Sequence, residues 1–115
     1  MCAKAEIALF LNNFKEKMAI WDVLFRDDRG KNTQALIDLE LRPIDRLAVL
    51  RALDVVDYSE GPLEDKLNNG PPMWVFGKMI KQQEVYIKIS MGLWGRSVIC
   101  ISFHIAEKVM LYPLK

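Results

Sequence analysis

The sequence has few of the residues that most often build metal and redox sites. Its 115 residues include two cysteines and one histidine. A zinc site would therefore need carboxylate ligands as well, and Cys2 and Cys100 cannot form a disulfide framework. The motifs GxxxxGK[ST], GxGxxG after a strand, HExxH and CxxC are all absent. We therefore expect no metal and no nucleotide cofactor.

Long apolar runs are also missing. No stretch approaches the roughly 20 apolar residues that a membrane helix needs. The first 14 residues are a poor signal peptide, because Glu6 accompanies Lys4 and no small-residue cleavage site follows. Cys100 lies in an apolar segment, which is typical of a buried thiol. We expect one cytoplasmic domain, residues 1–115, with no membrane partner.

The net charge of +1 conceals an uneven distribution. Residues 1–72 carry ten Lys or Arg and thirteen Asp or Glu, whereas residues 73–115 carry six and two. The basic half mildly favours an anionic partner, although an uneven surface charge of this size is equally ordinary on a globular protein.

Periodicity predicts helices in the first half of the chain. An amphipathic helix is expected over residues 4–18, followed by a strand at 19–25 and a charged turn at 26–32. Thr33 is expected to cap a short helix over residues 34–39, and Pro43 to begin a helix that ends near Asp54. Residues 57–72 contain two glycines and three prolines and are predicted to form a loop.

The second half is predicted to be β-structure. Strands are expected at about 73–80, 84–91 and 97–104, and the tail from Ala106 is expected to be irregular or an edge strand. Helices followed by antiparallel strands indicate an α+β fold. The N-terminal helices would pack on one face of a small antiparallel sheet, which leaves the other face for function or a partner.

The last two predicted strands divide into an apolar and a reactive face. With the two-residue period of a strand, one face carries Tyr86, Lys88 and Ser90 together with Cys100, Ser102 and His104. A hydrophobic core does not need this set, but a site that moves protons around a phosphate does. Each residue also has a purely structural explanation: a half-buried tyrosine, a solvated lysine, and a strand-end histidine bonded to a carbonyl.

The strand at 73–80 has two possible orientations. Either Trp74, Phe76 and Lys78 share the reactive face, or Met73, Val75 and Met79 do, and Gly77 leaves room for a bulge. The first orientation would combine aromatic rings with lysines, which is how proteins bind single-stranded RNA.

These strands resemble a known family. The segment MWVFGKMIKQQEVYIKI and the later strand ending ISFH resemble the C-terminal half of MqsR-type toxins, which are messenger-RNA interferases with a RelE-like fold. The matching features are Trp74, the Tyr86-Ile87-Lys88 strand and Ser102-Phe103-His104. The order of elements upstream, including Asp57-Tyr58, also follows the family.

The resemblance implies metal-independent cleavage of messenger RNA by the 2′-hydroxyl, and a cognate antitoxin as partner. Tyr86 matches a catalytic-site tyrosine, and His104 stands where family members can carry lysine. Two departures bear on activity: Val75 replaces a glutamine, and Ser59 and Glu60 stand near the position of an active-site lysine.

The working hypothesis is an endoribonuclease. His104 would be the general acid or base, Tyr86 would orient groups or share proton transfer, and Lys88 with Lys78 would stabilise the phosphorane. The expected substrate-binding residues are Trp74, Lys81 and Arg96. A non-catalytic RNA-binding domain and a protein-interaction module remain the alternatives.

Overall fold

The computed structural model describes residues 3–28 and 30–115. Its helices are α1 (Lys4–Trp21), α2 (Gly30–Asp38) and α3 (Asp45–Arg51), with a 3-10 turn, η1, over Val55–Asp57. Its strands are β1 (Val23–Phe25), β2 (Tyr58–Leu63), β3 (Met73–Ile80), β4 (Gln83–Ser90) and β5 (Val98–Ile105). The fold is α+β, as the sequence predicts.

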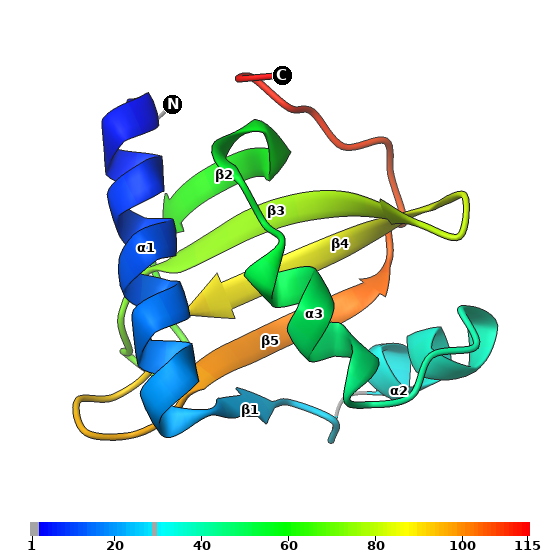
Figure 1. Cartoon of the computed structure of the whole chain (residues 1–115), viewed down its shortest axis with the longest axis horizontal. Helices are drawn as coiled ribbons and strands as arrows, with labels where there is room; N and C mark the ends of the chain where they lie inside the picture. The colour runs from blue at the N-terminus through cyan, green and yellow to red at the C-terminus, as the bar shows by residue number, and fades with distance from the viewer. Residues whose placement is uncertain (1–2, 29) are drawn as a thin grey trace.

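The strands form one sheet in the order β1-β5-β4-β3-β2 (Figure 1). The three pairs among β2, β3, β4 and β5 are antiparallel, but β1 pairs with β5 in parallel. The prediction of an antiparallel sheet is therefore wrong at this edge. The parallel pair joins residues 23–25 to residues 98–100, and local sequence patterns carry no information about such a distant pairing.

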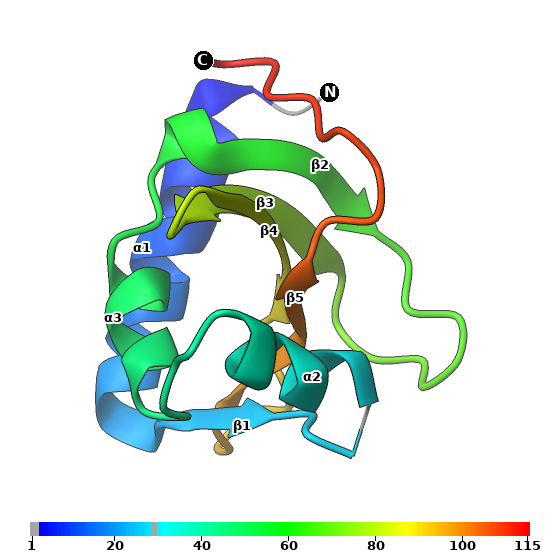
Figure 2. The ribbon, with the colours of Figure 1, turned by 90° about the vertical axis from the view of Figure 1, so that its right-hand side faces the viewer.

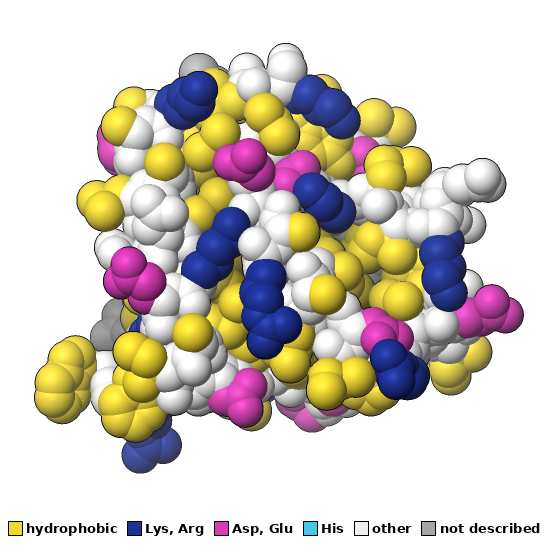
Figure 3. All heavy atoms as spheres, viewed as in Figure 1, with side chains coloured by type: hydrophobic (Ala, Val, Ile, Leu, Met, Phe, Trp, Pro, Cys, Tyr) yellow, Lys and Arg dark blue, Asp and Glu magenta, His cyan; other side chains and the backbone are white. Residues whose placement is uncertain are grey.

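Helices α1 and α3 lie on one side of the sheet, and the C-terminal tail lies on the other (Figure 2). Helices α1 and α3 cover one face, while the tail and the β2–β3 connection lie toward the other (Figure 2). Figure 3 views the helix-covered face, where basic and acidic side chains are interspersed and the single histidine of the chain is not visible. The tail after Ile105 contains no helix or strand, which settles the two possibilities left open by the sequence.

The hydrophobic core lies between α1, α3 and the sheet. The predicted apolar stripe of α1 is confirmed, and its buried residues are Ile7, Phe10, Leu11, Phe14 and Met18. The ring of Phe10 stacks on Trp74 of β3 with 4.5 Å between the ring centroids. From the strands, Val85, Ile87, Ile89 and Phe103 complete the same cluster.

Two predictions for the N-terminal half are wrong in their bounds. Residues 19–21 continue α1 and are not the start of a strand, since α1 ends only where Asp22 adopts φ 71° and donates its backbone N–H to the Met18 carbonyl. Helix α2 begins at Gly30, so Thr33 is not its cap but lies inside it, where its hydroxyl donates to the Gly30 carbonyl. Local propensity did not indicate either boundary.

The predicted helix from Pro43 to Asp54 is shorter than expected. Helix α3 covers only Asp45–Arg51, and Asp54 then caps the separate turn η1. Asp54 and Asp57 form a reciprocal capping box there, in which each side chain accepts the backbone N–H of the other residue. Asp54 Oδ1 also accepts the Val55 N–H. The short polar side chain of Asp54 therefore begins a new turn where helical periodicity suggested a continuous helix.

Part of the predicted loop at residues 57–72 is the edge strand β2. Tyr58–Leu63 pairs with β3, and its register shifts on both sides of Glu60. Gly61 and Pro62 fall in this irregular part of an edge strand, where a missing N–H donor is tolerated. By contrast, the three predicted strands of the second half are confirmed to within one residue at each end.

Candidate functional site

A groove of about 820 Å³ is lined by strand residues that alternate with the core residues of β4 and β5, so it lies on the sheet face opposite the core. Its floor contains Tyr86 and Lys88 of β4 and Ser102 and His104 of β5. The N-terminal end of α2, residues Ser59 and Glu60 of β2, and tail residues 107–111 form its walls. The four floor residues are among the six predicted to share a reactive face, and the structure brings these four together, whereas Ser90 lies outside this groove.

Tyr86 and His104 form a stacked pair at the centre of the groove. They are direct cross-strand partners, and their ring centroids lie 5.2 Å apart with 15° between the ring planes. His104 Nδ1 lies 3.0 Å from the carbonyl oxygen of Ile105. Because a carbonyl can only accept, Nδ1 carries the proton of neutral His104 and Nε2 is left as the proton acceptor.

The Tyr86 phenol is protonated at neutral pH, and its surroundings strengthen that preference. Desolvation of the phenol raises the pKa of Tyr86, and the negative charge of Glu60 raises it further. At neutral pH the hydroxyl is therefore a hydrogen-bond donor, not a base.

A second cross-strand row lies beside this pair. Lys88 pairs with Ser102 on one side and with Val75 on the other, and Val75 in turn pairs with Glu60. Directly paired residues place their side chains on the same face of a sheet. The three positions at which the chain departs from the MqsR-type pattern, residues 59, 60 and 75, therefore lie next to Lys88 and the groove.

Cys100 does not share the reactive face, so that part of the prediction is wrong. A register shift between Lys88 and Ile89 places Ser102 opposite Lys88 but Cys100 opposite Ile89, with Ile101 as the extra residue of a bulge. Cys100 is instead fully buried in the core, as its apolar context predicts. Burial raises the pKa of its thiol to about 12.

Trp74 and Lys78 lie on the helix-covered face and do not line the groove. Trp74 stacks on Phe10, and Lys78 Nζ lies 3.0 Å from Asp57 Oδ2 and 3.4 Å from the Ala52 carbonyl oxygen. Of the two orientations that the sequence left open for β3, the structure has the one that points Val75 toward the groove. The alternation of side chains within β3 could not show which of its two faces lies beside Tyr86 and Lys88, because that depends on the pairing register between β3 and β4.

Lys81 and Arg96 also lie outside the groove. Lys81 is in the β3–β4 turn, where its Nζ donates to the Glu40 carbonyl, and Arg96 is in the β4–β5 connection. The basic residues at the groove walls are instead Lys31 of α2 and Lys108 of the tail. Lys31 Nζ lies 2.6 Å from Glu107 Oε1, so this ion pair links α2 to the tail. Sequence reasoning missed both lysines, because nothing local to residues 31 or 108 marks them.

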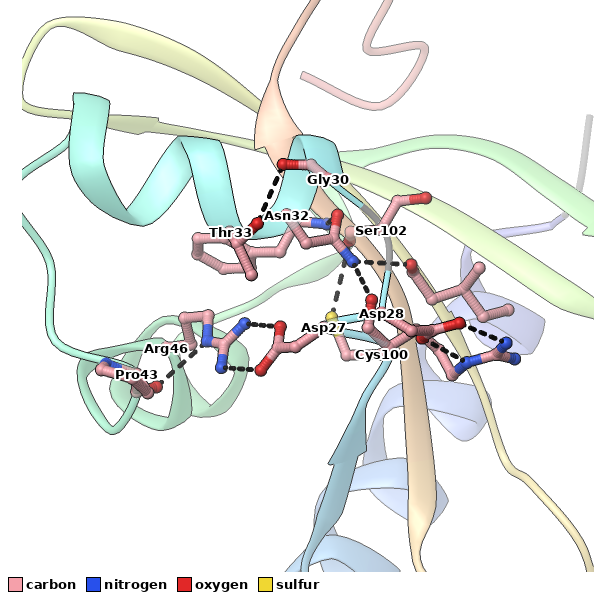
Figure 4. A network of polar contacts seen from close by, with 12 residues as sticks. Asp27, Asp28, Gly30, Asn32, Thr33, Pro43, Arg46, Cys100 and Ser102 are labelled. Atoms are coloured by element: carbon pink, nitrogen blue, oxygen red, sulfur yellow. Dashed lines mark hydrogen bonds and ion pairs between the residues drawn. The ribbon is translucent and has the colours of Figure 1, made fainter.

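A buried asparagine holds α2 against β5 (Figure 4). Asn32 is 1% exposed. Its amide nitrogen donates to the carbonyl oxygens of Arg26 and Ile101, and its side-chain oxygen accepts the Phe103 N–H. The pairing of β1 with β5 ends at Cys100. Beyond that point, the side chain of Asn32 provides the hydrogen-bond partners for the backbone groups of Ile101 and Phe103 at the edge of β5.

An ion pair supports the turn before α2. Arg46 of α3 is 2% exposed and makes a bidentate contact with Asp27, at 2.7 and 2.9 Å (Figure 4). The guanidinium also lies 3.8 Å from the centroid of the Phe25 ring. Hydrogen bonding to Arg46 holds the pKa of Asp27 below its usual value. The turn that leads into the groove wall is thereby fixed to α3.

The tail is fastened to the sheet beside the groove. Glu84 of β4 accepts the backbone N–H of Met110 and the hydroxyl of Tyr112. Tyr112 lies against Gly77 of β3, where a Cβ would come within 2.2 Å of its hydroxyl oxygen. The tail therefore acts as a strap that forms one wall of the groove.

Comparison with known proteins gives no identity. No family model, no curated protein and no solved structure matches the chain. Across residues 3–28 and 30–115, no group of three or more His, Cys, Asp or Glu side chains is placed to hold a metal ion. Within the same residues, no helix is long and apolar enough to span a membrane.

Proposed function

We propose that the protein is a metal-independent endoribonuclease that cleaves messenger RNA, of the MqsR type with a RelE-like fold. The observation that carries the proposal is the stacked Tyr86–His104 pair in one groove with Lys88 and Ser102. The proposal places the protein in the cytoplasm, with messenger RNA as substrate and a cognate antitoxin as partner.

The proposed chemistry uses two proton-transfer groups and one cation. The 2′-oxygen of a ribose attacks the adjacent phosphorus, the P–O5′ bond breaks, and a 2′,3′-cyclic phosphate forms. His104 Nε2 takes the proton of the 2′-hydroxyl, and the Tyr86 hydroxyl donates to the leaving 5′-oxygen or to a phosphate oxygen. The Lys88 ammonium stabilises the charge of the phosphorane.

The structure changes which basic residues we assign to flanking phosphates. Lys31 and Lys108 line the groove, whereas Lys81 and Arg96 do not, and Lys78 is likewise too far from the groove to assist Lys88 at the phosphorane. Contacts of this kind contribute affinity without sequence specificity and weaken as salt concentration rises.

The decisive experiment is an end-mapped cleavage assay in EDTA. Purified protein is incubated with a messenger RNA, and new ends are mapped for wild type, His104→Ala, Tyr86→Phe and Lys88→Ala. Lys4→Ala, which changes an exposed lysine at the start of α1, is the matched control. We expect the three groove variants to reduce cleavage at least about 100-fold, the usual scale of general acid–base catalysis. Unchanged cleavage by both His104→Ala and Tyr86→Phe would sink the proposal.

One observation favours a non-catalytic RNA-binding domain as the second candidate. Glu60 places a carboxylate on the groove wall near the position where the MqsR-type pattern has a lysine. Binding without cleavage, with affinity that falls steeply in salt, would support this candidate. If RNA is neither bound nor cut, with or without ribosomes, a protein-interaction module becomes the better explanation.

Expression in a bacterial host tests the toxin part of the proposal separately. A toxin stops growth unless a neighbouring gene supplies its antitoxin, and His104→Ala should restore growth. A binding module is harmless in both forms.

A further inference from the structure

A second pocket adjoins the candidate site on the same face of the sheet. Its volume is about 390 Å³, within the range of small-ligand pockets. Its floor comes from three strands and consists of Met73, Lys88, Ser90, Ile99 and Ile101. Residues 65–71 of the β2–β3 connection form one wall, and Arg26, Gly92 and Leu93 complete it.

The bulge in β5 gives this pocket its apolar floor. Because the register shifts at Ile101, the core receives Cys100 while Ile99 and Ile101 line the pocket. Without the shift, regular alternation would have placed Ile99 and Ile101 on the core face and Cys100 here. The same irregularity therefore shapes both the core and the pocket.

Lys88 lines both cavities. Along β4, Tyr86 is in the first groove and Ser90 in the second pocket, on either side of Lys88. At about 3.3 Å per residue these two positions are about 13 Å apart. A single-stranded chain that crosses Lys88 with its bases splayed apart would thus place one base on each side of the lysine and a phosphate at its ammonium group.

The chemistry of the second pocket suits a nucleotide. An apolar floor accepts the face of a base, and the amide of exposed Asn68 on the wall can reach a polar edge of that base. Lys66 and Arg26 supply positive charge, with Arg26 also paired to Asp28 at 3.1 Å. The carboxylate of Asp65 is directed into its own turn, where it accepts the Asn68 N–H.

We infer that this pocket binds the nucleotide next to the scissile phosphate, so that RNA crosses Lys88 with one base in each cavity. The inference rests on the proposed function, since it assigns the neighbouring subsite of the same substrate. It predicts that residues of the β2–β3 connection contribute to affinity although they lie outside the Tyr86–His104 groove.

Amide chemical-shift mapping tests the inference without relying on cleavage. A short single-stranded RNA with 2′-O-methyl sugars throughout, which cannot be cleaved by 2′-oxygen attack, is titrated into ¹⁵N-labelled protein. We expect shifts at Tyr86 and His104 together with shifts at residues 66–70 and Ile99. Shifts confined to Tyr86 and His104 would overturn the inference and leave the proposed function in place. Shifts confined to the second pocket would overturn the inference that RNA crosses Lys88 from one cavity to the other. No shifts in either cavity would overturn both this inference and the proposed endoribonuclease function.

Two variants add an affinity measurement by fluorescence anisotropy. Lys66→Ala should weaken oligonucleotide binding several-fold, and Ile99→Asp, which adds a carboxylate to the pocket floor, at least tenfold. Their matched controls are Lys4→Ala and Ile44→Asp, which change exposed residues of α1 and of the segment before α3. Lys66 is itself exposed, so its variant should fold even if Ile99→Asp does not. Wild-type affinity for Lys66→Ala, with pocket amides unmoved, would refute the subsite.

Discussion

At the scale of single residues, three features define the groove and tie it to the rest of the fold. The carbonyl of Ile105 fixes the protonated nitrogen of His104, and burial raises the pKa of the Tyr86 hydroxyl, which stays a donor at neutral pH. Farther away, the buried guanidinium of Arg46 has Asp27 as its ion-pair partner. The first two set the chemistry that the groove can perform, and the third sets the position of one wall.

Replacing Asp27 tests that ion pair. Asp27→Asn leaves the buried Arg46 without its counter-charge, and we expect the unfolding free energy to fall by about 1–3 kcal/mol. The loss is smaller than for a fully buried ion pair because the Asp27 side chain is 40% exposed. Chemical denaturation measures the loss. The matched control Asp38→Asn, on the exposed side of α2, should change stability by less than about 0.5 kcal/mol.

The same variant has a predicted pH dependence. Asp27 has a lower pKa folded than unfolded, so it binds protons more weakly in the folded state and its stabilising effect is complete above its ordinary value of 3.8. The effect disappears as pH falls through the lower folded value. The difference between wild type and Asp27→Asn should therefore be constant near neutral pH and shrink only below about pH 4. A difference that shrinks already between pH 7 and pH 5 would contradict this assignment.

At the scale of elements, the groove depends on two segments that join the sheet through side chains. Helix α2 is held to the edge of β5 by the amide of Asn32, and the tail is held to β4 by Glu84. Neither segment pairs as a strand, so each can be released without breaking the central hairpin. Two substitutions separate their contributions.

Asn32→Ala should loosen α2. Three buried or half-buried hydrogen bonds are lost, which costs about 2–4 kcal/mol. Hydrogen exchange should accelerate at residues 101–103 and through α2, but little in β3. Thr33→Ala, an exposed neighbour in the same helix, serves as the control. Equal protection of α2 in both variants would contradict the role of Asn32.

Gly77→Ala should release the tail. The new Cβ would lie 2.2 Å from the Tyr112 hydroxyl oxygen, so the tyrosine must move and leave Glu84. Because the tyrosine ring is at the end of a flexible side chain, we expect a small global cost of about 1–3 kcal/mol but much faster tryptic cleavage after Lys108. In the control Gly30→Ala the added Cβ has no atom within 4 Å, and cleavage should not change. Equal cleavage rates in the two variants would mean that Tyr112 does not fasten the tail.

At the scale of the whole molecule, one core connects the helix layer to the sheet whose opposite face carries the groove. Phe14 of α1 is fully buried in that core, whereas Leu9 of the same helix is 61% exposed. Comparing substitutions at these two positions therefore shows how much the packing of α1 on the sheet contributes to the unfolding free energy.

Phe14→Ala should cost about 3–5 kcal/mol, because it leaves a cavity beneath the sheet. Leu9→Ala should change the unfolding free energy by less than about 0.5 kcal/mol. Thermal or urea denaturation compares the two. Similar losses of unfolding free energy in the two variants would show that α1 does not pack on the sheet through the face that carries Phe14.

The sequence by itself determined the features that depend on local periodicity. The apolar stripe of α1, the three long strands, the common face of Tyr86 and Lys88 within β4 and that of Ser102 and His104 within β5 follow from side-chain spacing within short segments. Propensity did not identify β2, because Gly61 and Pro62 favour a loop unless an irregular edge pairing is available.

Only the tertiary structure decided the features that depend on pairing between distant segments. The parallel β1–β5 pair, the bulge at Ile101 that moves Cys100 into the core, and the direction of Trp74 and Lys78 are all consequences of register. A shift of one residue moves a side chain to the other face of a sheet, and no local pattern encodes it. Lys31 and Lys108, which are 77 residues apart in the sequence, meet at one groove because side-chain contacts hold α2 and the tail beside the same part of the sheet.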